Sequence, residues 1–372
     1  MTQLNLSEVL KRDPKFSIGC NKEKLVINKP RRIPLEIPKT IELSGKLLES
    51  LFLIFGDGHY KSKLNLTNHI YRIHNYTIQS LKSELDIPKE IWRLRIIHSK
   101  NKDKKLMNAI KRYWIETLNF ENKQLYPTIS PSFCYKTCEE GIARIQIDKM
   151  NVPDVVRMVL EEVIILIKNN ELNEKECCYI FDGILNAEGS VSMEYDGIHK
   201  ITISFNENEK NLFQNIFSNV IPKNILKDKN DRFIISKWCS IYQFLKPFTK
   251  YDIIPFSLRP KDAFKLVSGF LNHKRTKALR NYLETIQRNP EESFSKMAEL
   301  SNRDWKSAKQ TLQIRTKEFI QIRKFKNRHL TSMSKEGKNL IKIIKKLESW
   351  LPILEKMINE DELLMKELKE VN

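Results

Sequence analysis

The sequence predicts an α+β protein in which one folding unit occurs twice, followed by a basic segment of different character. Two apolar helical segments each end in a small residue, an acid and a glycine, at Gly56-Asp57-Gly58 and Ala187-Glu188-Gly189. Both segments are followed by residues that alternate between polar and apolar, as in half-buried strands. From residue 289 onward the chain becomes strongly basic. These three observations set the fold class and the order of the domains.

The first motif helix is expected between Ser44, a good N-cap residue, and Gly58. Its apolar residues recur at helical spacing, namely Leu47, Leu48, Leu51, Phe52 and Phe55. The second motif helix, over 176–189, is predicted in the same way from Cys177, Ile180, Phe181, Ile184 and Leu185. The two motifs lie 131 positions apart, counted from Gly58 to Gly189, which indicates an internal repeat.

Short amphipathic strands are expected after each motif helix. In the first half we predict strands at about 61–66, 92–97 and 143–149. In the second half, strands at 190–195 and 200–205 flank a turn at Asp196-Gly197 and predict a β-hairpin. Further helices are expected at about 70–85, 104–118, 155–167 and 209–220. Because this order of helices and strands occurs twice, it favours an α+β fold.

The last quarter of the chain differs from the rest in charge. Residues 289–347 carry fifteen Lys and Arg against six Asp and Glu, whereas residues 348–372 carry three against seven. Helical segments at 294–300 and 303–317, followed by a basic hairpin at 319–333, resemble a winged helix-turn-helix. We therefore divide the chain into an N-terminal extension (1–44), two repeats (45–170 and 171–288), a winged-helix DNA-binding module (289–347) and an acidic helical tail (348–372).

The composition narrows the classes of function. An excess of 65 Lys and Arg over 46 Asp and Glu gives a net charge of +19, which favours a polyanionic partner such as nucleic acid. The six cysteines form no CxxC pair with matching downstream ligands, so no zinc site is expected. No secretory signal is apparent, and the apolar run at 155–167 contains three charged residues. We expect an intracellular protein, in the cytoplasm or nucleoid, with reduced thiols and no membrane span.

The two motifs resemble the signature of a known family. Phe181-Asp-Gly-Ile-Leu-Asn-Ala-Glu-Gly189 resembles the LAGLIDADG signature over its whole length. Ser50-Leu-Phe-Leu-Ile-Phe-Gly-Asp-Gly58 resembles the common variant of this signature, which ends in Gly-Asp-Gly. The resemblance implies two pseudo-symmetric repeats, each with an antiparallel β saddle and helices behind it. Phe52 replaces the usual first glycine and is expected to pack over Gly183, while Asn186 replaces the first aspartate at a position expected to be structural.

The resemblance also implies an activity. Members of the family include homing endonucleases, hydrolases often encoded in introns, which make a staggered double-strand break with Mg²⁺ or another divalent cation. Asp57 and Glu188 would be the catalytic and metal-binding acids, with the backbone at Gly56 and Ala187 completing the metal site. Gly183 and Ala187 share a helix face, which would let the two motif helices approach closely. Family enzymes also place a basic residue near each metal, and Lys149 and Lys237 follow late strands at suitable places.

The exposed strand faces and the basic module would bind double-stranded DNA. The candidate contacts are Lys61, Lys63, Asn65, Arg93, Arg95, Arg144 and Gln146 in the first repeat, Lys200, Thr202, Ser204, Lys227 and Arg232 in the second, and Arg303, Lys306, Lys309, Arg323, Lys324, Lys326 and Arg328 in the module. Because both repeats are on one chain, we expect a monomer.

Two non-catalytic functions are open alternatives. Bacterial regulators fuse a LAGLIDADG-like domain to a helix-turn-helix and have lost cleavage, and some family members act as RNA maturases. The candidate winged helix favours such a binding protein, whereas the retained Asp57 and Glu188 favour a nuclease. An intein is not expected, because the sequence does not begin with a splicing-type Cys or Ser and does not end in His-Asn.

Removing residues 289–347 should weaken DNA binding and flatten its salt dependence, because the excess positive charge of this segment is concentrated on one helix and one hairpin. The slope of log K against log salt is about −0.9 per neutralised phosphate, so losing four contacts would lower its magnitude by about 3.6. Binding isotherms at several salt concentrations measure the slope. An unchanged slope in the truncated protein would count against the module.

Overall fold

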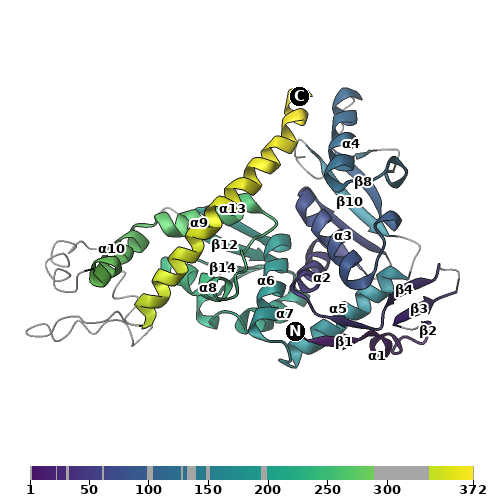
Figure 1. Ribbon diagram of the computed structural model, residues 1–372, viewed down its shortest axis with the longest axis horizontal. Helices are drawn as coiled ribbons and strands as arrows, with labels where there is room; N and C mark the ends of the chain where they lie inside the picture. The colour runs from purple at the N-terminus through teal and green to yellow at the C-terminus, as the bar shows by residue number, and fades with distance from the viewer. Residues whose placement is uncertain are drawn as a thin grey trace, which may run out of the picture.

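The computed structural model describes residues 2–21, 23–30, 33–60, 63–98, 104–126, 129–131, 140–147, 151–193, 199–288 and 335–371. Within these ranges the chain forms helices and several small, mainly antiparallel sheets, and the predicted α+β class is confirmed. Two units of similar construction lie side by side, and a long C-terminal helix crosses both (Figure 1). No helix in the described ranges is long and apolar enough to span a membrane.

The two units meet at the predicted motif helices, α2 (Gly45–Asp57) and α6 (Glu174–Glu188), which pack against each other. Both helices begin at a side-chain cap. Ser44 Oγ accepts a backbone hydrogen bond at 3.1 Å at the start of α2, and Asn173 forms a capping box at the start of α6. Each helix ends where the chain turns directly into a strand.

Small residues let the backbones of α2 and α6 approach closely. A β-carbon added to Gly183 would lie 2.6 Å from the carbonyl oxygen of Glu49 and 3.1 Å from Cβ of Phe52. One added to Gly56 would lie 2.7 Å from Cβ of Ala187. The expected pairing of Phe52 with Gly183 is therefore observed, and the large side chain occupies the space that the glycine leaves.

The first unit contains a five-stranded sheet in the order β6-β7-β10-β8-β9. Its strands are β6 (Gly58–His59), β7 (Leu64–Asn68), β8 (Arg93–His98), β9 (Ser130–Pro131) and β10 (Ile142–Ile147). Its helices are α3 (Tyr71–Leu85), η1 (Lys89–Ile91), α4 (Lys104–Leu118), η2 (Asn122–Gln124) and α5 (Val152–Lys168). The predicted helices of this half are confirmed to within a few residues.

The second unit contains a four-stranded sheet in the order β11-β12-β14-β13. Its strands are β11 (Gly189–Met193), β12 (His199–Ser204), β13 (Lys227–Lys229) and β14 (Arg232–Ile235). Its helices are α7 (Glu207–Ser218), η3 (Lys223–Ile225), α8 (Trp238–Tyr251), α9 (Pro260–Asn272) and α10 (Lys274–Arg288). The predicted hairpin is formed by β11 and β12, although its turn lies outside the described residues. The order of the four strands matches that of β6, β7, β10 and β8.

A second repeated sequence marks the same place in both units. Ile87-Pro-Lys-Glu-Ile91 and Ile221-Pro-Lys-Asn-Ile225 each contain a short 3-10 helix, η1 and η3, shortly before the next strand. They lie 134 positions apart, close to the spacing of 131 between the motifs. The two units thus share an order of elements, a strand order and a second sequence signature, which the sequence analysis did not use.

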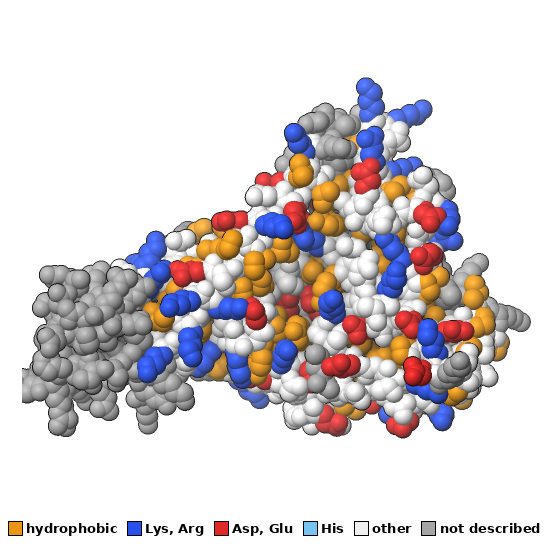
Figure 2. Space-filling model, viewed as in Figure 1, with side chains coloured by type: hydrophobic (Ala, Val, Ile, Leu, Met, Phe, Trp, Pro, Cys, Tyr) orange, Lys and Arg blue, Asp and Glu red, His pale blue; other side chains and the backbone are white. Residues whose placement is uncertain are grey.

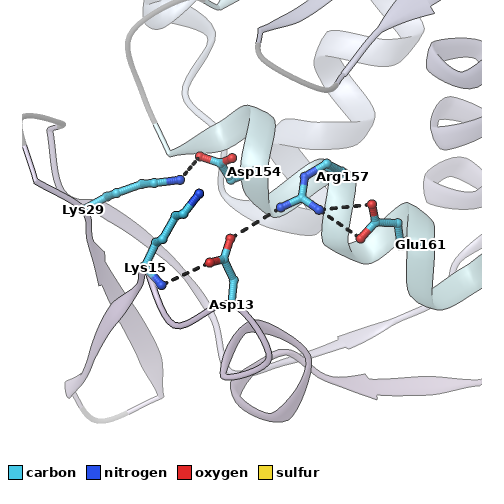
Figure 3. Close-up of polar contacts among 6 residues, drawn as sticks. All are labelled: Asp13, Lys15, Lys29, Asp154, Arg157 and Glu161. Carbon is cyan, nitrogen blue, oxygen red and sulfur yellow. Dashed lines mark hydrogen bonds and ion pairs between the residues drawn. The ribbon is translucent and has the colours of Figure 1, made fainter.

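The residues before α2 form a small extension that packs on the first unit. It comprises β1 (Gln3–Asn5), α1 (Leu6–Leu10), β2 (Ser17–Asn21), β3 (Lys24–Asn28), β4 (Leu35–Pro38) and β5 (Thr40–Glu42). Figure 3 shows its polar attachment to α5: Lys29 Nζ lies 2.9 Å from Asp154, and Arg157 lies 3.5 Å from Asp13. Within α5, Arg157 also lies 3.0 Å from Glu161. Because Lys29 and Asp154 are mostly buried, water screens their attraction less than that of an exposed pair.

The last described helix, α13 (Lys335–Val371), bridges the two units (Figure 1). It packs against α8 and α9 of the second unit and against α4 of the first. On the first unit, Asp361 accepts hydrogen bonds from Arg72 at 2.7 Å and from the Tyr71 hydroxyl at 3.0 Å. This helix therefore ties the two units together outside the contact between α2 and α6.

The helix α13 runs unbroken through position 347, where the sequence analysis placed a domain boundary. Leu340 and Ile344, on the basic side of that position, are buried in the common core. Residues 335–347 are therefore part of the body of the protein, and a truncation that tests the basic module has to end before Lys335. The predicted winged helix, with all of its candidate DNA contacts between Arg303 and Arg328, lies outside the described residues.

Replacing Gly183 with Ala should destabilise the protein by about 1–3 kcal/mol, although Ala is the better helix former by about 1 kcal/mol. The added methyl group would meet the backbone carbonyl of Glu49, which cannot rotate away. Urea unfolding measures the change. Gly19→Ala is the matched control, because the nearest atoms to a β-carbon added there lie 3.9 Å away. Equal losses in the two variants would contradict close packing at Gly183.

Candidate functional site

The two motif acids lie at neighbouring helix ends. Asp57 is the last residue of α2, and Glu188 is the last residue of α6. The side chain of Glu188 lies beside Gly56, because a β-carbon added to that glycine would sit 3.4 Å from Glu188 Oε1. Ala187 packs against the same glycine. The structure therefore brings together all four residues that the sequence analysis assigned to the metal site.

Both acids lie in surroundings that disfavour their charge. Burial raises the pKa of Asp57 to about 7, and the Glu188 carboxylate adds to the shift, while a hydrogen bond from Asn68 and the charge of Arg259 oppose it. Burial also raises the pKa of Glu188, with a further contribution from Glu209. The ends of α2 and α6 are in addition the negative ends of two helix dipoles. A cation between the acids would relieve each of these penalties.

The donor atoms at this site suit a hard divalent cation. Carboxylates and the carbonyl groups of a helix end, which lack partners within the helix, offer oxygen ligands only. Oxygen ligands are those that Mg²⁺ prefers. Within the described ranges, no group of three or more His, Cys, Asp and Glu side chains could hold a metal ion. A cation held by Asp57 and Glu188 would need further oxygen ligands, such as backbone carbonyls, water or phosphate oxygens.

Arg259 is a residue of the site that the sequence analysis missed. Its guanidinium donates to the carbonyl oxygen of Gly189, the residue after Glu188, and lies 2.6 Å from Asp262. Its positive charge also acts on Asp57. The arginine is 70 residues from Gly189 in the sequence and precedes α9, where no local motif marks it. Only the fold brings it to the end of α6.

The lysines predicted to polarise water are placed differently. Lys149 lies outside the described residues. Lys237 is exposed at the start of α8 and forms no hydrogen bond or ion pair with Asp57 or Glu188. Across the sheet, Gly189 is level with Phe233. Lys237 comes four residues after Phe233, which corresponds to roughly 13 Å of extended chain. Among the described residues, the structure shows no contact between Lys237 and the acids, whereas the charge of Arg259 acts on Asp57.

A buried network of hydrogen bonds joins the two motif helices. We call it the acid network, and it consists of Glu49, Tyr76, Asp182, Asn186 and Ser257. Ser257 Oγ lies 3.1 Å from a Glu49 oxygen and 2.8 Å from an Asp182 oxygen. The Tyr76 hydroxyl and the Asn186 amide donate to Glu49 at 2.6 and 3.2 Å. These contacts fit the structural role expected for Asn186, whereas Glu49 and Asp182 were not foreseen.

The acid network holds two carboxyl groups that cannot both be charged at low cost. Burial raises the pKa of Glu49, and the nearby Asp182 raises it further. Burial likewise raises the pKa of Asp182. Both shifts favour a shared proton between the two carboxyl groups, inside the interface that positions Asp57 and Glu188.

The outward face of the first sheet carries a row of arginines. Arg144 is level with Arg95 on one neighbouring strand and with Thr67 on the other, and it donates to Thr67 at 3.0 Å. Arg93 is exposed on the same face of β8. The guanidinium of Arg95 lies 4.5 Å from the ring centre of Tyr126, an aromatic residue that the sequence analysis did not include. Guanidinium groups beside an aromatic ring suit phosphates and bases.

Two of the predicted DNA contacts in this sheet are buried. Asn65 and Gln146 are only 7% and 5% exposed. Gln146 donates to the Tyr126 hydroxyl at 2.7 Å, so it supports that ring and is not open to a partner. Lys63 is exposed as predicted, and Lys61 lies outside the described residues. The predicted set of contacts is thus corrected, because a polar residue in a strand can serve the sheet itself.

The second sheet presents a polar face of its own. Its predicted contacts, all of them at least partly exposed, are Lys200, Thr202, Ser204, Lys227 and Arg232. The strand register puts them on one face, because Ser204 is level with Arg232, and Thr202 and Lys227 are both level with Ile234. The opposite face, which includes Ile201, Ile203 and Phe233, is buried. Lysines and arginines are also scattered widely over the face of the molecule seen in Figure 2.

No model of a known protein family matches the chain, and no curated protein matches it at a significant level. The residues of the site and their geometry are therefore the basis for assigning a function.

The metal-free protein should lose stability as the pH rises through neutrality, because Asp57, Glu49 and Asp182 have raised pKa values in the folded state. Their protonated forms stabilise the fold fully below the unfolded pKa of about 4. This contribution is lost as the pH rises through the folded pKa, at up to about 1.4 kcal/mol per pH unit for each group. Glu49→Gln should flatten the slope, measured by urea unfolding at several pH values.

The matched control for this experiment is Glu36→Gln, at an exposed position of β4. It should leave the dependence of stability on pH unchanged. A slope in the Glu49→Gln variant as steep as that of the parent protein would contradict a proton held by the acid network.

Proposed function

We propose that this chain is a site-specific endodeoxyribonuclease of the LAGLIDADG type, which binds double-stranded DNA and cuts both strands with a divalent cation. The observation that carries the proposal is the packing of α2 against α6, which puts Asp57 and Glu188 at adjacent helix ends. Each of these helices leads directly into a sheet with a polar outer face. Acids at the junction of two such sheets suit the cutting of a nucleic acid that lies across both.

Several features support two pseudo-symmetric repeats on one chain. The motif helices, the Ile-Pro-Lys turns and the strand orders correspond between the units. A protein with two related halves suits a duplex, whose two strands are themselves related by approximate twofold symmetry. A single chain can then act as a monomer and read a target whose halves differ.

The outer faces of the two sheets supply the binding surface in this proposal. Arg93, Arg95 and Arg144 would contact phosphates and base edges on one side of the cutting site, and Lys200, Lys227 and Arg232 would do so on the other. The net charge of +19 adds a salt-dependent attraction that does not depend on sequence. The helix α13 contacts both units and would help to hold the two faces in a fixed arrangement on the DNA.

The chemistry assigned to the site is hydrolysis of a phosphodiester bond. A divalent cation, when bound, lowers the pKa of a water molecule and offsets negative charge on the phosphate. Asp57 and Glu188 would hold it, together with the backbone at Gly56 and Ala187. Their burial keeps competing water away and strengthens each electrostatic contact. Arg259 holds the end of α6 through the Gly189 carbonyl and adds positive charge beside the place where the phosphate would lie.

Asp57→Asn and Glu188→Gln should each reduce double-strand cleavage to background, because the amides keep the shape of the side chain but lose the charge that holds the cation. DNA affinity should stay within about threefold, since the basic faces of the sheets are untouched. Both variants should also stabilise the metal-free protein, by on the order of 0.3–2 kcal/mol, because one of two repelling charges at the helix ends is gone.

The experiment incubates a library of DNA duplexes, and in parallel a library of structured RNAs, with Mg²⁺ or Mn²⁺, followed by binding measurements in EDTA on the selected site. Ile165→Ser, at an exposed position of α5, is a control that should cut as the parent does. A parent protein that binds selected duplexes but cuts none of them is a DNA-binding regulator. A parent protein that binds RNA and no DNA duplex is better described as a maturase, and either result would overturn the proposed nuclease.

A further inference from the structure

We propose that Asn68 is a positioning residue for Asp57 and that it makes the Asp57 half of the site different from the Glu188 half. This inference rests on the proposed function, and it predicts that the two strands of one DNA target are cut at unequal rates. It follows from the contacts of Asn68 and from the residue that takes its place in the second unit.

Asn68, the last residue of β7, is held at three points. Its amide nitrogen donates to Asp57 Oδ2 at 2.6 Å. Its amide oxygen accepts from the backbone N–H of Ile70 at 2.8 Å, and its carbonyl oxygen lies 3.0 Å from Nε2 of the buried His74. A side chain fixed in this way can hold Asp57 in one orientation. The second oxygen of Asp57 forms no hydrogen bond within the described ranges and remains for a cation.

The second unit has no such donor at the matching place. Gly58 is level with Leu66, and Gly189 is level with Ile203, so the residue two positions further on is Asn68 in one unit and Phe205 in the other. Phe205 is 7% exposed, and its ring lies 4.3 Å from that of Phe233. A phenyl ring cannot donate a hydrogen bond to a carboxylate.

The surroundings of Glu188 differ from those of Asp57 in other ways as well. Glu188 forms no hydrogen bond within the described part of the chain, and Glu209 adds a second negative charge near it besides that of Asp57. Asp57 has both the Asn68 donor and the positive charge of Arg259. Asp57 is thus oriented before a cation binds, whereas Glu188 has to be oriented by the cation and the nucleic acid.

Loss of a hydrogen-bond partner of a ligating carboxylate typically costs about 10- to 100-fold in metal affinity or activity. The loss of metal affinity and activity should be confined to the half of the site that contains Asp57. The strand cut by that half should therefore slow when Asn68 is replaced, while the other strand is cut at close to its original rate.

Asn68→Ser is the informative variant. The serine hydroxyl can still accept from the Ile70 N–H in a turn of similar type, but it is too short to reach Asp57. The first readout needs no activity: thermal unfolding during a titration with Mn²⁺ alone. The Mn²⁺ concentration that gives half of the full stabilisation should rise by about 10-fold or more. The second readout is single-turnover cleavage of the selected duplex with each strand labelled, in which one strand should slow by about 10-fold or more.

Asn75→Ser on α3 is the matched control, because it makes the same substitution at a half-buried position and should change neither readout. A lower melting temperature for Asn68→Ser with an unchanged Mn²⁺ midpoint and equal slowing of both strands would mean that Asn68 only stabilises the turn. That result would overturn the inference and leave the nuclease standing. A parent protein that cuts no DNA, together with a shifted Mn²⁺ midpoint, would overturn the proposed function and leave the positioning role.

Discussion

The contact between α2 and α6 is the constraint on which the rest of the structure depends. The backbones can approach because Gly183 faces Glu49 and Phe52, and Gly56 faces Ala187. The separation of the two helix backbones determines how far apart the carboxylates of Asp57 and Glu188 lie, and therefore whether one cation can lie between them. It also brings the acid network together inside the interface, where a bulkier face would keep the two helices apart. A few small side chains thus determine the relation between both units.

Residues that belong to a local pattern could be predicted from the sequence. The motif helices follow from apolar spacing and caps, and the row of Arg93, Arg95 and Arg144 follows from the alternation of side chains in strands. The acids were found because a motif that ends in an acid and a glycine occurs twice. Each of these signals lies within about a dozen neighbouring positions, where spacing alone decides which face a side chain occupies.

Residues placed by tertiary contacts could not be predicted in this way. Arg259 and Asn68 reach the site from loops and strand ends whose sequence resembles any polar segment. Glu49 and Asp182 look like solvated positions on a helix, yet both are buried because a second helix covers them. Asn65 and Gln146 are the corresponding case in strands, because the alternation of side chains predicted that they are exposed whereas the structure buries them. The repeated Ile-Pro-Lys turn is an exception, since it was present in the sequence and would have strengthened the case for two repeats.

Near both ends of the described chain, a segment attached to one unit also contacts the other unit. These contacts affect whether the protein stays in one piece when its backbone is cut. The backbone N–H of Thr2, next to the extension on the first unit, donates to Glu176 of α6 at 2.7 Å. The helix α13 returns from the second unit to Arg72 of the first. Each half therefore has a segment that forms hydrogen bonds with the other half. A single proteolytic break between α5 and α6, near residue 170, would leave two fragments that stay associated, so the molecule can survive a break in its backbone that would separate two ordinary tandem domains.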